Sequence, residues 1–271
     1  MSAFRFCSRR GAALCALAGL LASAPAHAQL DFGKINRAID NAKNVGKVAK
    51  GVTGIGLEEE QVLGESVAAE IIGAHGGLVR DEAMTRRVNL IGRALAHYSS
   101  RPALQWRFGI LNSDTVNAFS APAGYVFVTR GLYSIVGDDD DALAAVLAHE
   151  ITHITERHAL KIVGRGEFLA GATALASDRS SDVRQLQNDL RHFDLGVEKV
   201  VKVLLEQGFD PQTEYAADRG GRDLALTTGY APGALRRVLV RLQQDQDGPR
   251  KVFSTHPPLE NRIERLPDRD T

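Results

Sequence analysis

The hydrophobic pattern of the chain predicts helices over much of its length. Apolar residues recur every three to four positions, as a buried helix face requires, in the stretches 57–72, 84–97, 197–205 and 232–244. The acidic run 138–141 precedes a further stretch rich in Ala and Leu. Acids favour the positive end of a helix dipole, so we expect one continuous helix there, ending near residue 163. Asp210 and Pro211 predict another helix start, as an N-cap followed by proline at the first helical position.

A different pattern lies between the second and third of these helices. Trp106, Phe108 and Ile110 alternate with other residues, as the side chains of a short strand do. The run Tyr125–Thr129 has the strongest β-forming composition in the chain, and the segment Ala121–Gly124 before it predicts a turn. We therefore expect an α+β fold that is predominantly helical, with a small sheet among the helices.

The first 28 residues have the three parts of a secretory signal peptide. Three arginines and no acid precede an apolar run over 11–22, which is too short for a membrane span of about 20 residues. Ala26-His27-Ala28 then forms a cleavage site before Gln29, while Ser8-Arg9-Arg10 also allows a twin-arginine export signal. We expect cleavage near Ala28, a linker or short leading helix over 29–56, and one domain over 57–271. Nothing later is long and apolar enough to span a bilayer, so the mature chain is expected to be soluble.

The composition and charge exclude several classes of protein. The 271 residues are 44% hydrophobic and 24% charged, which excludes a disordered or collagen-like chain. The 33 basic and 33 acidic residues balance, so there is no electrostatic reason to expect nucleic acid as a partner. Loss of the signal peptide would remove three arginines and both cysteines, Cys7 and Cys15, leaving a net charge of −3. The mature protein would then have no thiol with which to bind a metal or form a disulfide.

The clearest chemical motif is His149-Glu150-Ile151-Thr152-His153, within the helix that follows the acidic run. Histidines at positions i and i+4 lie on one face of a helix, where they offer two ligands to one Zn²⁺. Glu150 lies slightly further round the helix, close enough to act on a water molecule at the metal without binding the metal itself. The motif predicts a catalytic zinc site.

A third ligand has to come from elsewhere. A metzincin needs Gly at 156 and His at 159, where this chain has Glu156 and Ala159. On a continuous helix His158 is roughly 140° round from His153, so we expect that it cannot join the cluster of ligands. The remaining candidates are carboxylates from other helices, namely Glu167, Glu198, Glu206 and Glu214. We favour Glu214, because Asp218 follows one turn later and suits a hydrogen bond to the second nitrogen of a ligating histidine.

Four motifs, in the same order along the chain, resemble one known family. They are Asn117–Leu132, His149–His153 continuing to Arg157-His158, Glu214–Asp218, and Ser254–Pro258 with Arg262 beyond. Together they resemble the zinc metallopeptidase family of the CAAX prenyl-protein endopeptidase, HtpX and the periplasmic proteases BepA and LoiP. The likeness covers about 57–262 and is greatest to periplasmic single-domain members. Ala123 departs from the pattern, which usually has a second glycine there.

The resemblance implies a gluzincin, a zincin-like fold with a small sheet over the helix of the histidine motif. His149, His153 and Glu214 would bind one Zn²⁺ per chain, Glu150 would be the general base, and Asp218 would support a ligand. His256 is a candidate for stabilising the oxyanion or for gating the metal as a fourth ligand. The strand of Tyr125, Val126, Phe127, Val128 and Thr129 would offer its edge to the substrate.

From these observations we expect a zinc metalloendopeptidase of the cell envelope. Its expected partners are misfolded or unassembled envelope proteins, and its expected location is the periplasm, with peripheral association with the outer membrane also compatible. The alternative is a non-catalytic assembly factor or chaperone in which zinc only stabilises the fold. The intact Glu150 favours the enzyme, because a purely structural zinc site needs no base.

Overall fold

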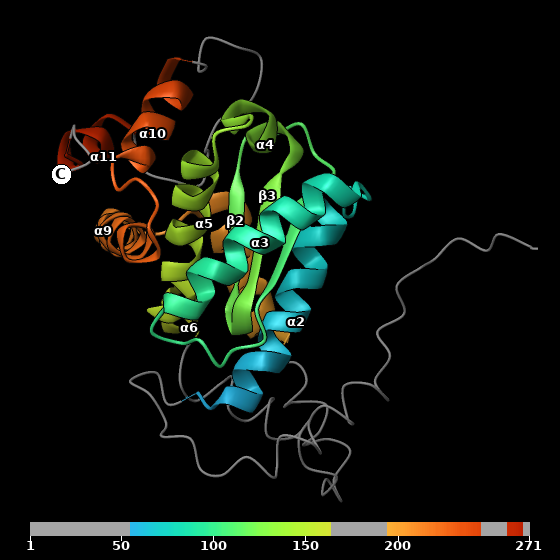
Figure 1. Ribbon diagram of the computed structural model, residues 1–271. Helices are drawn as coiled ribbons and strands as arrows, with labels where there is room; N and C mark the ends of the chain where they lie inside the picture. The colour runs from blue at the N-terminus through green and yellow to red at the C-terminus, as the bar shows by residue number, and fades with distance from the viewer. Residues whose placement is uncertain (1–54, 164–193, 245–258, 268–271) are drawn as a thin grey trace, which may run out of the picture.

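The computed structural model of the protein describes residues 55–163, 194–244 and 259–267 (Figure 1). The predictions for the signal peptide, the linker up to residue 54, Glu167 and His256 lie outside these residues. The predicted long helices are all present, as α2 (Leu57–Ala74), α3 (Glu82–Tyr98), α5 (Asp140–Thr155), α9 (Pro211–Thr228) and α10 (Ala234–Gln244). Residues 194–202 are helical and continue into η2 (Val203–Gln207). The shorter helices are α4 (Arg130–Val136), α6 (His158–Ile162) and α11 (Leu259–Arg265). The α+β, predominantly helical class is confirmed.

The sheet has three strands among the described residues, β1 (Arg107–Leu111), β2 (Ala118–Ala121) and β3 (Tyr125–Thr129), in the order β1-β3-β2. β1 pairs with β3 in parallel and β2 pairs with β3 antiparallel. The prediction that Tyr125–Thr129 is an edge strand is therefore wrong, because both of its backbone edges are used. The two edge strands of the sheet are β1 and β2. β2 has no alternation in the sequence because all four of its residues are buried.

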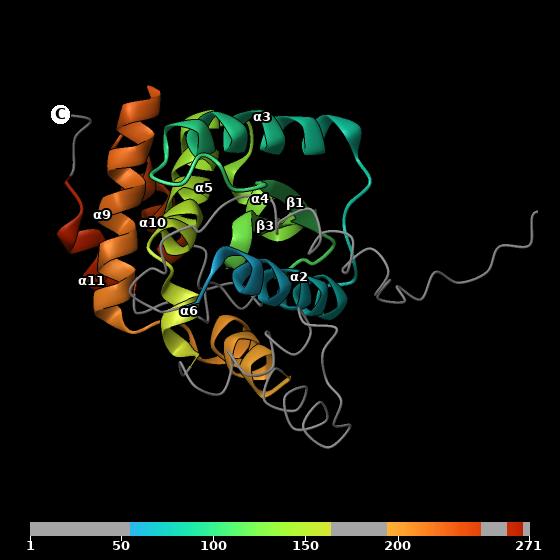
Figure 2. The same cartoon turned by 90° about the horizontal axis from the view of Figure 1, so that it is seen from below.

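Helices cover both faces of this sheet, as the two views show (Figure 2). Successive β3 residues alternate between two apolar cores: Val126 and Val128 face the core that includes α3, α5 and α10, while Phe127 faces the core that includes α2. Burial on both faces explains why the β3 sequence is almost continuously apolar. It also places α5, with the histidine motif, directly against the sheet.

The turn before β3 has a backbone conformation at residue 123 that glycine would adopt more easily than alanine. Ala123, within the short 3-10 helix η1 (Pro122–Gly124), has φ +63°, in the left-handed region that glycine adopts most readily. A glycine at this position would enter the conformation without the steric penalty of a Cβ atom.

The helix of the histidine motif is shorter than predicted. It starts as expected, with Asp139 as the N-cap that accepts a hydrogen bond from the backbone N–H of Ala142. It ends at Thr155, and Arg157 has φ +58° before α6 begins at His158. The prediction of one helix to about residue 163 is therefore wrong. Among the described residues, none of the helices combines the length and apolar character that crossing a membrane requires.

Candidate metal centre

Helix α5 brings the whole histidine motif into the interior of the protein. His149, Glu150 and His153 are 2%, 2% and 3% exposed, respectively. The two histidines lie one turn apart, with their Nε2 atoms 3.1 Å from each other. Such deep burial of two imidazoles and a carboxylate carries a large desolvation cost, which favours a bound ion or a hydrogen-bond network over a surface role.

Helix α9 supplies the third candidate ligand. It begins where Asp210 and Pro211 predicted, and Asp210 accepts hydrogen bonds from the backbone N–H groups of Gln212 and Thr213. Glu214, fully buried in its first turn, has its carboxylate oxygens 3.5 Å from His149 Nε2 and 3.6 Å from His153 Nε2. One ligand atom from each of the three residues lies within 4.8 Å of the other two.

These spacings fit a tetrahedral zinc site. Zinc bonds to nitrogen and oxygen of about 2.0–2.2 Å place neighbouring ligand atoms roughly 3.3–3.6 Å apart. The two Nε2 atoms are 3.1 Å apart, and each lies 3.5 or 3.6 Å from a different carboxylate oxygen of Glu214, separations close to that range. Two imidazoles and one carboxylate are also a donor set that zinc accepts in hydrolytic sites.

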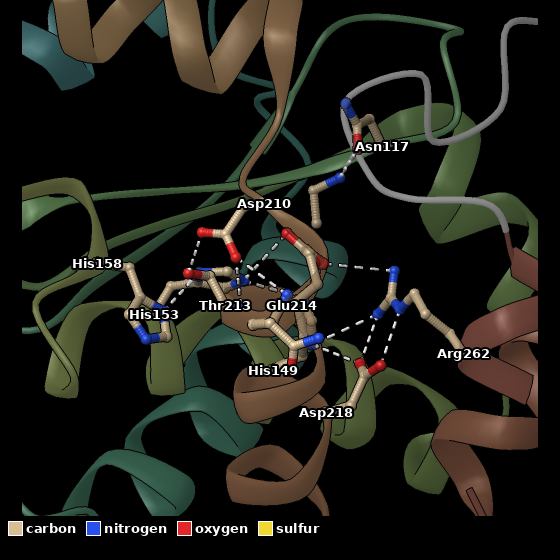
Figure 3. Close-up of polar contacts among 11 residues, drawn as sticks. Asn117, His149, His153, His158, Asp210, Thr213, Glu214, Asp218 and Arg262 are labelled. Carbon is tan, nitrogen blue, oxygen red and sulfur yellow. Dashed lines mark hydrogen bonds and ion pairs between the residues drawn. The ribbon is translucent and has the colours of Figure 1, made fainter. Parts of the chain in front are cut away.

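His149 is held from its other side by a buried ion pair (Figure 3). Its Nδ1 lies 3.0 Å from Asp218 Oδ1, so Nδ1 carries the proton and Nε2 offers its lone pair to the site. Arg262 of α11, fully buried, donates to both oxygens of Asp218 at 2.6 and 2.9 Å. Asp218 thus has the position expected of a residue that supports a ligand, and Arg262 is its counter-charge.

The charges of this network favour a cation at the site. Burial alone lowers the pKa of His149, but hydrogen bonds to Asp218 and Glu214 outweigh burial and raise that pKa to about 9. Burial raises the pKa of Asp218, yet the Arg262 charge and the hydrogen bonds from His149 and Arg262 bring it down to about 2. The two carboxylates therefore attract positive charge to His149, whether a proton or a metal ion.

His153 has different neighbours. Its Nδ1 lies 3.0 Å from Nδ1 of His158, and its ring stacks on Phe209 with the ring centres 4.5 Å apart. His158 is not among the described residues grouped as possible metal ligands. The sequence reasoning assumed that α5 continues past Thr155, and therefore missed this contact with His153. Burial, with the charge of Lys161, lowers the pKa of His158 to about 4. At neutral pH His158 is therefore a neutral imidazole.

Glu150 has one side-chain oxygen, Oε1, that is buried without a hydrogen-bond partner among the described residues. An unsatisfied buried carboxylate oxygen is costly, so such an atom calls for a partner such as water or substrate. Glu150 shares α5 with both histidines.

The structure also separates the candidates for the third ligand. Glu198 and Glu206 are exposed, whereas Glu214 is buried beside both histidines. Two contributors were absent from the predicted site, His158 and Arg262. Both residues lie within the motifs that resemble the family. Those motifs marked the two positions, but they did not indicate that His158 contacts His153 or that Arg262 contacts Asp218.

Comparison with known proteins agrees with this geometry. Residues 82–270 match the sequence profile described as peptidase family M48. The chain belongs to peptidase family M48. Membership of this family implies a metal, and His149, His153 and Glu214 are a set of described residues able to hold one.

Individual relatives share about a quarter to a third of their residues with the chain. The beta-barrel assembly-enhancing proteases of Yersinia pestis and Escherichia coli K12 are 26% and 27% identical over 91% and 83% of this chain, and 51% and 46% of their own length. A protease HtpX homolog of Bacillus licheniformis is 32% identical over 58% of this chain and 61% of its own length. The chain thus spans about half the length of the beta-barrel assembly-enhancing proteases it matches.

Proposed function

We propose that this protein is a zinc-dependent metalloendopeptidase of the cell envelope. The observation that carries the proposal is the convergence of His149, His153 and Glu214 from helices α5 and α9. Beside it, Glu150 of α5 has a buried Oε1 without a hydrogen-bond partner in the described part of the chain. Three protein ligands leave a fourth position for water or substrate, as catalytic zinc sites do. A closed structural site would need neither the open position nor the base.

In this mechanism the chain's own residues hold the metal and move the proton. His149, His153 and Glu214 would be the ligands, and Asp218 would fix the tautomer of His149. Zinc, when bound, would supply the Lewis acidity that acidifies water and polarises the peptide carbonyl. Glu150 Oε1 would take the proton of the attacking water and deliver it to the departing amide nitrogen. His256 lies outside the described residues. Its role as an oxyanion stabiliser or as a fourth ligand that gates the metal remains a prediction from the sequence.

The sheet offers a place for the substrate backbone. The outer edge of β2, Ala118–Ala121, pairs with no other strand in the described part of the chain. An extended peptide can add to such an edge through main-chain hydrogen bonds. This binding mode suits unfolded polypeptides, because a folded segment already uses those backbone groups.

The names of two relatives and the predicted signal peptide support the proposed substrates and location. Two of the relatives are named beta-barrel assembly-enhancing proteases. Their name supports our proposal that the substrates are misfolded or unassembled envelope proteins. The predicted signal peptide over 1–28 supports export to the periplasm, followed by a linker to residue 56 and the peptidase domain over 57–271. Peripheral association with the outer membrane is compatible with these assignments.

The test is cleavage of unfolded casein by the purified mature chain, followed on a gel. Zinc-loaded wild type should cleave, and chelation or Glu150→Gln should abolish cleavage, because the carboxylate is the proton acceptor. Glu156→Gln is the matched control, since this exposed residue caps the same helix and should keep full activity. Equal cleavage by the Glu150→Gln protein would refute the mechanism. Zinc binding without cleavage of any unfolded substrate would favour the non-catalytic assembly factor.

A further inference from the structure

The break between α5 and α6 reorients a histidine toward the metal centre. A helix continuing from His153 would carry residue 158 roughly 140° round the axis, facing away. Arg157, with φ +58° and ψ +36°, turns the chain instead. As a result Nδ1 of His158 lies 3.0 Å from Nδ1 of His153, and both rings are almost fully buried.

A buried carboxylate holds this break in place. Glu60 of α2, 1% exposed, accepts a hydrogen bond from Arg157 Nη2 at 3.0 Å, and the same nitrogen donates to the carbonyl of Ile55. Arg101 donates to both oxygens of Glu60 at 2.8 and 2.9 Å and also to the carbonyl of Ile154 in the last turn of α5. The left-handed residue is thus tied to Glu60 of α2 and to Ile55 just before that helix, and such ties are what maintain a strained backbone conformation.

The contact between the two histidines has only one useful arrangement of protons. Two Nδ1 atoms 3.0 Å apart share a single proton, so one ring donates and the other accepts. His153 points Nε2 toward His149 Nε2 and Glu214 Oε1, where a ligand needs a lone pair. The proton therefore belongs on Nδ1 of His153, and His158 is the acceptor.

We propose that His158 is a positioning residue that holds His153 in the ligating tautomer and ring orientation, with the Glu60–Arg157 contact fixing its place. His158 does for His153 what Asp218 does for His149, with a neutral acceptor in place of an anion. Phe209 fixes the remaining freedom of the ring by stacking on its face. The inference rests on the proposed function only in taking His149, His153 and Glu214 as the zinc ligands.

The test compares zinc affinities of the purified full mature chain, measured by competition with a chromogenic chelator. His158→Phe keeps a ring and removes the acceptor, and it should weaken zinc binding about 10- to 100-fold, as loss of such partners does elsewhere. His158→Asn restores an acceptor near the position of Nδ1 and should bind within about threefold of wild type. His97→Phe, at an exposed position of α3, should equal wild type.

A second readout separates positioning from packing. The visible absorption of the Co²⁺-substituted protein should change in His158→Phe and be retained in His158→Asn, because it reports ligand geometry. If His158→Phe does not fold, Arg157→Gln replaces it, since loosening the break should also lower zinc affinity while His158 is intact.

Each outcome decides between the claims. Wild-type affinity in His158→Phe, or in Arg157→Gln where that variant replaces it, overturns the inference. Equal losses in the Phe and Asn variants also overturn it, because packing would then explain both. Failure of the wild type to bind zinc refutes the proposed function instead.

Discussion

Gly221 of α9 lies against the main chain of His149 on α5, with no room for a methyl group between them. A Cβ atom at position 221 would lie 2.8 Å from the backbone N of His149 and 2.9 Å from its Cα. Backbone atoms cannot swing aside as a side chain can. Gly221 is on the same face of α9 as Glu214 and Asp218, which are seven and three residues earlier. This close approach allows both carboxylates to reach His149.

Gly221→Ala should therefore displace α9 from α5 and impair the metal site. We expect the free energy of unfolding to fall by about 1–3 kcal/mol, the usual cost of overpacking, with a parallel loss of zinc affinity. Urea unfolding and chelator competition measure the two effects. Gly73→Ala is the control, since a Cβ there meets nothing within 4 Å. Alanine in a helix should make that variant equally or more stable. Unchanged zinc affinity in Gly221→Ala would contradict the role of the close approach.

Glu214 should be required for stabilisation by zinc. An ion at about 100 times its dissociation constant stabilises the folded state by about 2.7 kcal/mol, which corresponds to a rise in Tm of roughly 5–10 °C for a domain of this size. Thermal unfolding with and without zinc should show that rise in wild type and little of it in Glu214→Gln. Glu206→Gln removes a carboxylate from an exposed position and should respond as wild type does. A full zinc response in Glu214→Gln would exclude it as a ligand.

Arg262 should contribute strongly to stability. Arg262→Gln leaves Asp218 buried without its counter-charge, and breaking a buried pair from one side costs about 3–5 kcal/mol. The control is Arg130→Gln, which breaks an exposed pair with Asp114 and should cost at most about 1 kcal/mol. Urea unfolding of the metal-free proteins measures both. Similar losses of unfolding free energy in the two variants would show that burial of the Arg262–Asp218 pair does not increase its contribution to stability.

The N-cap residue of α5, Asp139, should make the free energy of unfolding decrease at acidic pH. Burial raises the pKa of Asp139, but the hydrogen bond from the Ala142 N–H and the ion pair with Arg241 outweigh it and lower that pKa. The carboxylate therefore stabilises the fold above its unfolded pKa, and this contribution is lost as pH falls through the lower folded pKa. Asp139→Ala should cost about 1 kcal/mol at pH 7. Urea unfolding at pH 7 and below pH 3.8 should show that deficit shrinking in acid; a constant deficit would contradict the ion-pair contribution.

Local rules accounted for much of the fold. Apolar periodicity predicted α2, α3 and α10 within about two residues at each end, and Asp210 with Pro211 predicted the start of α9. These features depend on contacts between residues close in the chain, which a sequence pattern records directly. The strand β2 left no pattern, because burial of all four residues removes the alternation that marks a half-exposed strand.

The sequence by itself determined that His149, Glu150 and His153 share one helix, since a spacing of four residues places both imidazoles on one face whatever surrounds them. Only the tertiary structure decided that Glu214 lies beside them while Glu198 and Glu206 are exposed, that β3 is central, and that His158 contacts His153. These outcomes depend on how closely α9 approaches α5 at Gly221, on how the strands pair, and on the break between α5 and α6, where Arg157 is held by Glu60. Each joins residues far apart in the chain, and no local periodicity records such a contact.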